Sequence, residues 1–115
     1  EVRSSNILYG VHVYCAWEGH DMVKDRIRLA APRIPLILDE WGQGCPHKHC
    51  EVDPQRTDDW MSLIDEFGLS HVNWVLNDKS DDVDSTLSAL VPGASDRGGW
   101  TDRDFTDAGR LTAAS

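Results

Sequence analysis

The sequence lacks the features of proteins that bind nucleic acids or span membranes. Its 11 lysine and arginine residues are outnumbered by 20 aspartate and glutamate residues, so the net charge is −9. Nucleic-acid binding requires clustered basic side chains, and this charge balance argues against it. No apolar run approaches the roughly 20 residues of a membrane-spanning helix. We therefore expect a globular protein with neither a nucleic-acid partner nor a membrane partner.

The chain is also short, and it contains few cysteines. At 115 residues it can form one domain, residues 1–115, with no second domain. It is too short for a complete (β/α)8 barrel, which takes roughly 250 residues. The three cysteines are Cys15, Cys45 and Cys50, and one of them stays unpaired when the other two bond. Cys45 and Cys50 could close a tight loop, or Cys15 could pair with either of them.

The most informative stretch is residues 34–42, where an apolar run leads into a carboxylate. Leu36, Ile37 and Leu38 are typical of a strand that is buried on both faces. Glu40 follows at the carboxyl end of this strand, where a charged side chain loses hydration and needs a reason beyond packing. In a parallel α/β barrel, the carboxyl ends of the strands carry the chemistry. We therefore predict that Glu40 is catalytic.

Strand and helix patterns alternate along the chain. The predicted strands cover residues 7–14, 34–42 and 72–76, and the predicted helices cover residues 20–31, 54–67 and 106–114. Asp53 followed by Pro54 indicates the start of the second helix, and Gly68 indicates its end. Residues 85–104 show no periodic element. Helices between successive strands predict a parallel sheet whose carboxyl ends lie at one edge.

The first predicted strand has one apolar and one polar face. Alternation directs Val11 and Val13 to one face and His12 and Tyr14 to the other. His12 and Tyr14 thus lie near the carboxyl end, where an imidazole and a phenol can contact a neighbouring group. Gly10 weakens the strand and indicates a close approach by another part of the chain.

Five motifs occur in order along the chain: YGVHVY, LILDEWG, HVNWVLNDKS, LVPGAS and GGWTDRDFTDAGR. Together they resemble the C-terminal part of bacterial endo-β-1,4-glucanases of glycoside hydrolase family 5. The resemblance covers nearly the whole chain and implies an α/β fold, a partial (β/α)8 TIM barrel whose three parallel strands resemble strands 6–8. It also implies an extracellular, secreted enzyme that hydrolyses cellulose or a related β-glucan with retention of anomeric configuration. We expect no cofactor and no metal in its site.

The resemblance assigns catalytic roles to three residues. Glu40 resembles the nucleophile that forms the glycosyl-enzyme intermediate. Tyr14 resembles the phenol that hydrogen-bonds this nucleophile, and His12 resembles the imidazole that orients it and contacts sugar. An ionised carboxylate is favoured by hydrogen-bond donors, which both side chains supply.

Further residues resemble the sugar-binding positions of the family. Trp74 resembles the platform on which a sugar ring stacks next to the scissile bond. Lys79 and Asp81 resemble positions that hydrogen-bond more distant sugar hydroxyls, although family members often carry Glu where Asp81 stands. Trp100 is expected to be structural. Each position has a plainer interpretation: Trp74 as a core ring, and Lys79 with Asp81 as a solvated loop pair.

The chain departs from the family pattern in two ways. The family usually has a small residue before the nucleophile, and here that residue is Asp39. Strand pleating predicts that Asp39 points away from Glu40, so we expect it not to be the second carboxylate. The second departure is an absence, because the family's acid/base glutamate follows an asparagine, and the 115 residues contain no Asn-Glu pair.

These departures predict a fragment or a truncated relative of a cellulase, inactive alone or as a homodimer. Its uncovered strand edges should pair with the missing part of a barrel or associate with a second copy. The alternative is a non-catalytic glycan-binding fragment or an inactive truncated homologue, in which Trp74, His12 and Tyr14 still contact sugar. A structural ion pair is the plainer interpretation of Glu40.

The stretch from Cys45 to Cys50 is the one cluster that the resemblance does not explain. It contains His47 and His49 between the two cysteines. Four sulfur and nitrogen donors match the ligand count of a closed zinc site, although the spacing is tighter than in established zinc motifs. The stretch could instead form an internal disulfide, share a disulfide with Cys15, or keep its thiols free.

Overall fold

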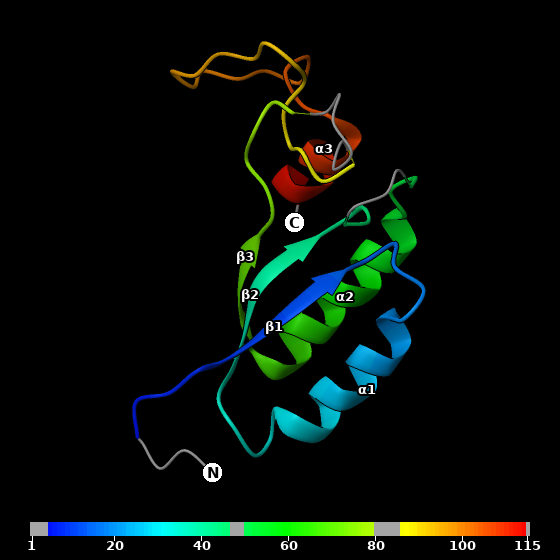
Figure 1. Cartoon of the computed structure of the whole chain (residues 1–115), viewed down its shortest axis with the longest axis vertical. Coiled ribbons are helices and arrows are strands. Elements are labelled where there is room, and N and C mark those ends of the chain that lie inside the picture. Colours follow the sequence, from blue (N-terminus) through cyan, green and yellow to red (C-terminus); the bar gives the residue numbers. More distant parts are fainter. Residues whose placement is uncertain (1–4, 47–49, 80–85, 115) are drawn as a thin grey trace.

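Three parallel strands with helices between them form the main body of the protein. The computed structural model describes residues 5–46, 50–79 and 86–114. The elements in chain order are β1 (Tyr9–Tyr14), α1 (His20–Ala30), β2 (Leu36–Gly42), α2 (Pro54–Phe67), β3 (Ser70–Asn73) and α3 (Asp107–Ala114). β2 lies between β1 and β3, and both pairings are parallel. The predicted α/β fold with a parallel sheet is thus confirmed (Figure 1).

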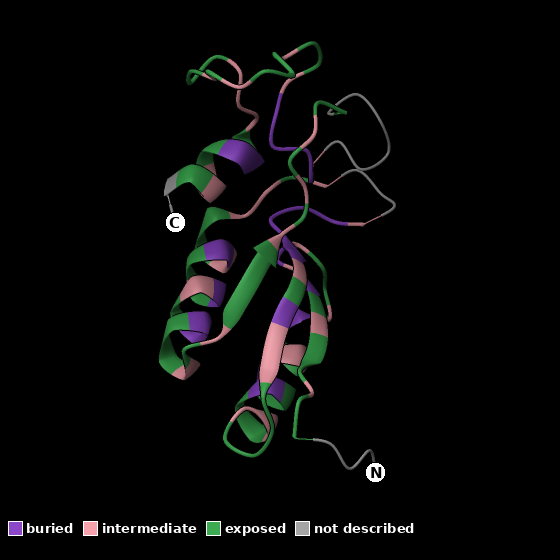
Figure 2. Cartoon of the chain, turned by 90° about the vertical axis from the view of Figure 1, so that its left-hand side faces the viewer, coloured by how far each residue is buried: buried purple, intermediate pink, exposed green. Residues whose placement is uncertain are grey.

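Helices α1 and α2 cover one face of the sheet, and the hydrophobic core lies between them and the strands (Figures 1 and 2). The buried core residues are Val13, Cys15, Ile27, Leu38, Trp41, Trp60, Leu63 and Ile64.

We call the side of the sheet opposite to α1 and α2 the open face. Several large apolar side chains outside the core are well exposed, among them Leu8, Val72 and Leu76. α3 and residues 92–104 lie beyond the carboxyl ends of the strands (Figure 1). None of the helices described is long and apolar enough to cross a membrane.

Local sequence signals set both ends of α2. The Asp53 side chain accepts a hydrogen bond from the Arg56 backbone N–H at 3.0 Å, and Pro54 occupies the first turn. Gly68 ends the helix with φ 58°, a left-handed conformation that glycine adopts without steric cost. The predicted boundaries of this helix are therefore confirmed.

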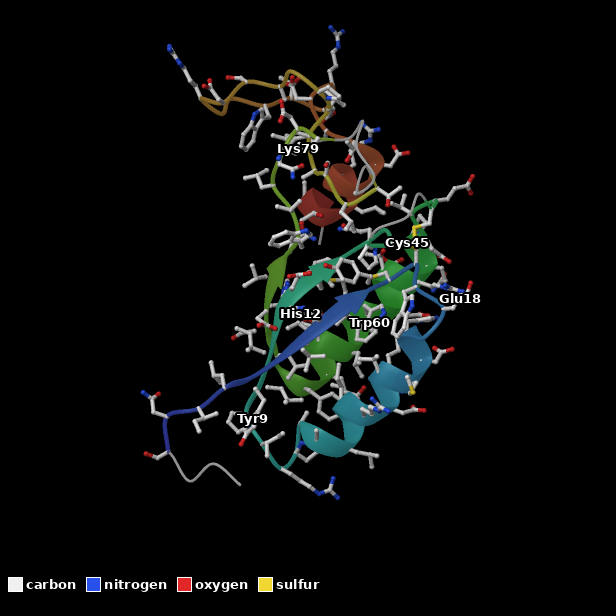
Figure 3. The ribbon with its side chains drawn as sticks, viewed as in Figure 1. Tyr9, His12, Glu18, Cys45, Trp60 and Lys79 are labelled. Atoms are coloured by element: carbon white, nitrogen blue, oxygen red, sulfur yellow. A yellow bond between two sulfur atoms is a disulfide. The ribbon has the colours of Figure 1, made fainter. Side chains whose placement is uncertain are left out.

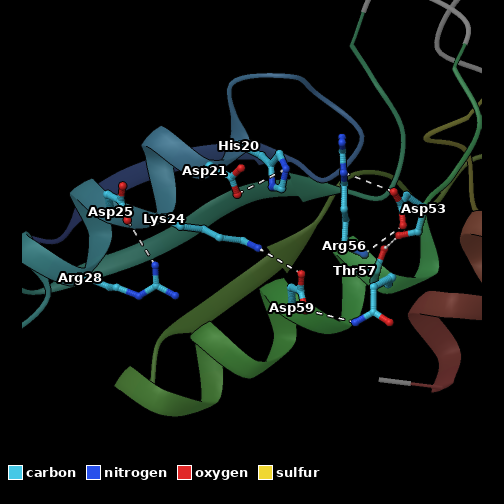
Figure 4. A network of polar contacts seen from close by, with 10 residues as sticks. His20, Asp21, Lys24, Asp25, Arg28, Asp53, Arg56, Thr57 and Asp59 are labelled. Carbon is cyan, nitrogen blue, oxygen red and sulfur yellow. Dashed lines mark hydrogen bonds and ion pairs between the residues drawn. The ribbon is translucent and has the colours of Figure 1, made fainter.

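An ion pair joins α1 and α2 at the edge of the core. Lys24 is buried, and its Nζ lies 3.8 Å from an Asp59 carboxylate oxygen (Figure 4). The same Nζ lies 5.3 Å from the centre of the Trp60 ring. A buried ammonium group requires such partners, because it has lost most of its hydration. These contacts fix the two helices against one another on the side of the sheet away from the open face.

The third strand differs from its predicted range. β3 spans Ser70–Asn73 instead of residues 72–76. After Trp74, whose N–H donates to the Trp41 carbonyl at 2.6 Å, the chain leaves the sheet. Val75 then exchanges backbone hydrogen bonds of 3.0 Å with Leu87 and Ala89. Residues 72 and 73 of the predicted strand thus belong to β3, whereas Val75 pairs with residues 87 and 89.

The C-terminal region follows the sequence expectation closely. Residues 86–104 contain no helix or strand, and an isolated antiparallel bridge joins Leu90 to Phe105. α3 begins at Asp107, one residue later than predicted. The Thr106 hydroxyl accepts a hydrogen bond of 3.1 Å from the Gly109 N–H and so caps this helix.

Candidate active site

An irregularity in the pairing of β1 with β2 shapes the candidate site. Gly10 pairs with Ile37, and His12 pairs with Glu40. β1 advances by two residues between these pairs while β2 advances by three, so β2 contains one extra residue. Such a β-bulge locally interrupts the alternation of side chains between the two faces of a sheet.

The bulge changes which side chains of β2 face the core. Leu38 and Trp41 are three residues apart, yet both are buried in the core beneath the sheet. Asp39 and Glu40, between them, both lie within 4 Å of His12, whose strand directs Val11 and Val13 toward the core. Two neighbouring carboxylates therefore lie on the open face, near the carboxyl end of the middle strand.

Glu40 lies between the two side chains that the sequence places beside it. The Tyr14 hydroxyl donates a hydrogen bond to Glu40 Oε1. His12 Nδ1 lies 3.8 Å from Glu40 Oε2, and His12 itself is labelled on β1 in Figure 3. The Glu40 side chain is 22% exposed, so it is partly withdrawn from solvent but still accessible. The structure thus brings together the three residues predicted to be catalytic.

The predicted orientation of Asp39 is wrong. Asp39 Oδ1 lies 3.6 Å from His12 Nε2, so its carboxylate is on the same face as Glu40 and does not point away. The physical reason is the bulge, which breaks the two-residue period that the prediction assumed. Gly10 was the signal that could have revealed this placement, because a Cβ there would lie 2.5 Å from Asp39 Oδ2. The close approach predicted at Gly10 is therefore made by this carboxylate.

The predicted sugar-binding residues follow β3. Trp74 is the first residue after the strand, and it is 44% exposed, which contradicts its interpretation as a core ring. Lys79 is exposed on the segment beyond the sheet, far from His12 (Figure 3). Its N–H donates to Asn77 Oδ1 at 3.2 Å. Asp81 lies outside the described residues.

Gln43 is a site-adjacent residue that the sequence analysis missed. It is fully buried directly after β2, and its Nε2 donates to the Thr112 hydroxyl at 2.5 Å. This contact connects the strand that carries Glu40 to α3, which is 69 residues further along the chain. A lone glutamine in a loop sequence gives no signal of such a distant contact.

The cysteines of the loop after β2 are paired. Cys45 and Cys50 form a disulfide, and the Thr86 hydroxyl accepts a 3.4 Å hydrogen bond from the Cys45 N–H. Cys15 is free and buried, and burial raises the pKa of its thiol to about 12 because the thiolate would lose its hydration. His47 and His49 lie outside the described residues. In residues 5–46, 50–79 and 86–114, no group of three or more His, Cys, Asp or Glu side chains could hold a metal ion.

The sequence is similar to bacterial endoglucanases over almost its whole length. No protein-family model matches it. It is 33% identical to Endoglucanase N of Pectobacterium atrosepticum over 112 residues, which are 96% of this chain and 24% of that protein. It is 32% identical to Endoglucanase 5 of Pectobacterium carotovorum, covering 96% of this chain and 21% of that protein. The chain therefore spans less than a quarter of the length of these two relatives.

The fold is similar to part of several solved structures. A protein from Cytophaga hutchinsonii superposes with a TM-score of 0.82 at 30% identity, covering 95% of this chain and 34% of that one. The catalytic domain of Thermobifida fusca endoglucanase Cel5A superposes with a TM-score of 0.83 at 24% identity, covering 96% of this chain and 35% of that one. A GH5 cellulase from an Icelandic hot spring isolate gives a TM-score of 0.72 at 18% identity, covering 94% of this chain and 36% of that one.

The likenesses in sequence and in fold agree with each other. The three parallel strands and their helices match about a third of a cellulase catalytic domain, which confirms the predicted partial TIM barrel. The two sequence relatives, both matched across most of this chain, are named as endoglucanases. The chain is thus similar in sequence to a segment of bacterial endoglucanases, and its fold corresponds to about a third of a cellulase catalytic domain.

Proposed function

We propose that this chain is the nucleophile-bearing part of a retaining endo-β-1,4-glucanase that acts on cellulose or a related β-glucan. The observation that carries the proposal is the position of Glu40, at the carboxyl end of the middle strand between the Tyr14 hydroxyl and His12. The carboxyl ends of barrel strands are where such enzymes place their reacting groups. The names of the sequence relatives support this class of substrate.

The contacts of Glu40 suit nucleophilic attack. In the first step its carboxylate would bond to the anomeric carbon while the glycosidic C–O bond breaks, and the departing oxygen would take a proton from the acid/base carboxyl. In the second step the acid/base group, now a carboxylate, would deprotonate a water molecule. This water would attack the anomeric carbon and release Glu40, so that the anomeric configuration is retained. Tyr14 would hold the attacking carboxylate in place by donating to Oε1.

We expect the acid/base carboxyl of this mechanism to come from outside the 115 residues. Retaining enzymes hold the two carboxyls about 5–5.5 Å apart, one on each side of the scissile bond. Asp39 adjoins Glu40 in β2 and contacts the same imidazole, so it lies on the nucleophile's side of the bond. The sequence contains no Asn-Glu pair of the kind that carries the acid/base in this family.

Within the described residues, β1 and β3 are the outer strands of the sheet, and their unpaired edges support docking of the missing barrel part. A mostly apolar groove lies between β1, α1 and the start of β2, and it is lined by Val11, His12, Val23, Arg26, Ile27, Ala30 and Leu36. A neighbouring strand and helix of a barrel would cover such a groove and would pair the edge of β1. Association of two copies through these edges would not supply an acid/base, because both copies lack it.

Sugar binding and location complete the proposal. The exposed ring of Trp74 would stack on a sugar face, with Lys79 and Asp81 contacting more distant hydroxyls. The Cys45–Cys50 disulfide supports an oxidising, extracellular location. A polymeric glucan substrate lies outside the cell, so an enzyme that acts on it would be secreted.

A chimera tests the proposed function. The chain would replace the matching segment of Endoglucanase N, and the hydrolysis of carboxymethylcellulose by the chimera would be compared with that by the isolated chain. We expect the chimera to release reducing ends and the isolated chain to release none above background. Turnover by the pure 115-residue chain, abolished by Glu40→Gln, would refute the need for an external acid/base.

The second candidate is a non-catalytic glycan-binding fragment. The observation that favours it is the exposure of two side chains that could contact sugar, those of Trp74 and His12, the latter 58% exposed. Glu40 beside His12 lacks an acid/base glutamate of the Asn-Glu type in the sequence. A chimera that folds and binds cellotetraose but does not hydrolyse carboxymethylcellulose would favour this candidate over the enzyme.

A further inference from the structure

Asp39, Glu40, His12 and Tyr14 form a cluster on the open face, and the proposed mechanism gives Asp39 no role. The family resemblance places a small residue at this position, yet here a carboxylate contacts the imidazole beside the nucleophile. We propose, on the basis of the proposed function, that Asp39 is a positioning residue: it holds the His12 ring through Nε2 so that Nδ1 faces Glu40.

The two nitrogens of His12 face different carboxylates. Nε2 lies 3.6 Å from Asp39 Oδ1, and Nδ1 lies 3.8 Å from Glu40 Oε2. An imidazole has two distinct nitrogens, and the partner of one nitrogen fixes the tautomer and the ring orientation that the other presents. Asp39 therefore determines which atom of the ring faces the nucleophile.

Packing alone does not hold this ring. The His12 side chain is 58% exposed, so few neighbouring atoms restrict rotation about its Cβ–Cγ bond. A half-turn of the ring would exchange each nitrogen with a carbon and would move Nδ1 away from Glu40. A polar contact at Nε2 disfavours this rotation, because the turned ring would present a carbon to the Asp39 carboxylate.

Two features of the backbone make room for the Asp39 carboxylate. The bulge in β2 brings Asp39 to the open face. Gly10 leaves the space in which the carboxylate lies, since a Cβ there would be 2.5 Å from Oδ2 and 2.6 Å from Oδ1. Substitution of Gly10 should therefore displace the carboxylate without removing its charge. Gly10 substitution is therefore a second way to remove the contact between Asp39 and His12.

The contact is tested first without catalysis. Long-range ¹H–¹⁵N spectra of the imidazole would be recorded for the chain and its Asp39→Ala, Gly10→Ala and Glu40→Gln variants. We expect the His12 Nε2 resonance to shift in the first two variants and the Nδ1 resonance to shift most in the third. Asp58→Ala removes an equal charge at an exposed position of α2 and should leave both resonances unchanged. An Nε2 resonance unmoved in both Asp39→Ala and Gly10→Ala overturns the proposal.

The consequence for the nucleophile is tested in the chimera. Asp39→Ala should lower kcat about 10-fold with little change in KM, because a misoriented imidazole affects the reacting carboxylate more than substrate binding. Asp39→Asn keeps an acceptor oxygen and should recover most of this loss, which a purely structural defect would not predict. Equal kcat in Asp39→Ala and the unaltered chimera overturns the positioning role. Shifted resonances with an inactive chimera support the contact and place the failure in the proposed function.

Discussion

Glu40→Gln in the chimera should lower the hydrolysis of carboxymethylcellulose by at least about 10⁴-fold, the scale of losses seen when a nucleophile is removed. The amide has nearly the same size as the carboxylate, and its oxygen can still accept the Tyr14 hydrogen bond. It cannot, however, form the covalent bond to the anomeric carbon. The expected loss is therefore in kcat, and circular dichroism and thermal unfolding should stay close to those of the unaltered chimera.

The control for this prediction is Glu66→Gln. Glu66 is exposed on α2, on the helical side of the sheet, and its substitution makes the same chemical change far from the open face. Its kcat should equal that of the unaltered chimera. Activity of the Glu40→Gln variant within 10-fold of this control would mean that another carboxylate is the nucleophile.

Trp60→Ala should lower the free energy of unfolding of the protein by about 4 kcal/mol, as large-to-small substitutions of buried aromatic residues do. Trp60 is 0% exposed and belongs to the core between the sheet and α2, where Figure 3 labels it. The substitution would also remove the ring above which the buried Lys24 ammonium lies. Because domains are stable by only about 5–15 kcal/mol, this loss should be evident in urea denaturation.

Trp17→Ala provides the comparison for Trp60. Trp17 lies in the connection between β1 and α1 and is 42% exposed. Removal of an exposed ring creates no enclosed cavity, so the expected loss of unfolding free energy is below about 1 kcal/mol. Equal losses in the two variants would show that Trp60 does not anchor the core as its burial indicates.

The helices were predictable because their signals are local. Asp53, Pro54 and Gly68 lie within or beside α2 and act on its own backbone, so the sequence alone placed both ends of the helix. The end of β3 was less predictable. Val75 has a side chain typical of strands, but its backbone pairs with Leu87 and Ala89, and such a distant partner leaves no trace in the neighbouring residues.

The candidate site was predictable only in part. His12 and Tyr14 share a face by simple alternation, and the structure places both beside Glu40. The orientation of Asp39 depends on a bulge, which arises from the pairing of two strands and not from the sequence of either one. The disulfide partner of Cys45 could not be predicted for a similar reason, because the geometry of the folded loop decides which cysteine comes within bonding distance.

Covalent trapping of the glycosyl-enzyme tests most directly whether Glu40 is the nucleophile. The chimera would be incubated with dinitrophenyl 2-deoxy-2-fluoro-β-cellobioside, whose leaving group departs without a proton and whose fluorine slows hydrolysis of the intermediate. Peptide mass spectrometry should then locate one fluorocellobiosyl group on Glu40, and the Glu40→Gln variant should carry none. A label on Asp39 or on any other carboxylate, with Glu40 unmodified, would contradict this assignment.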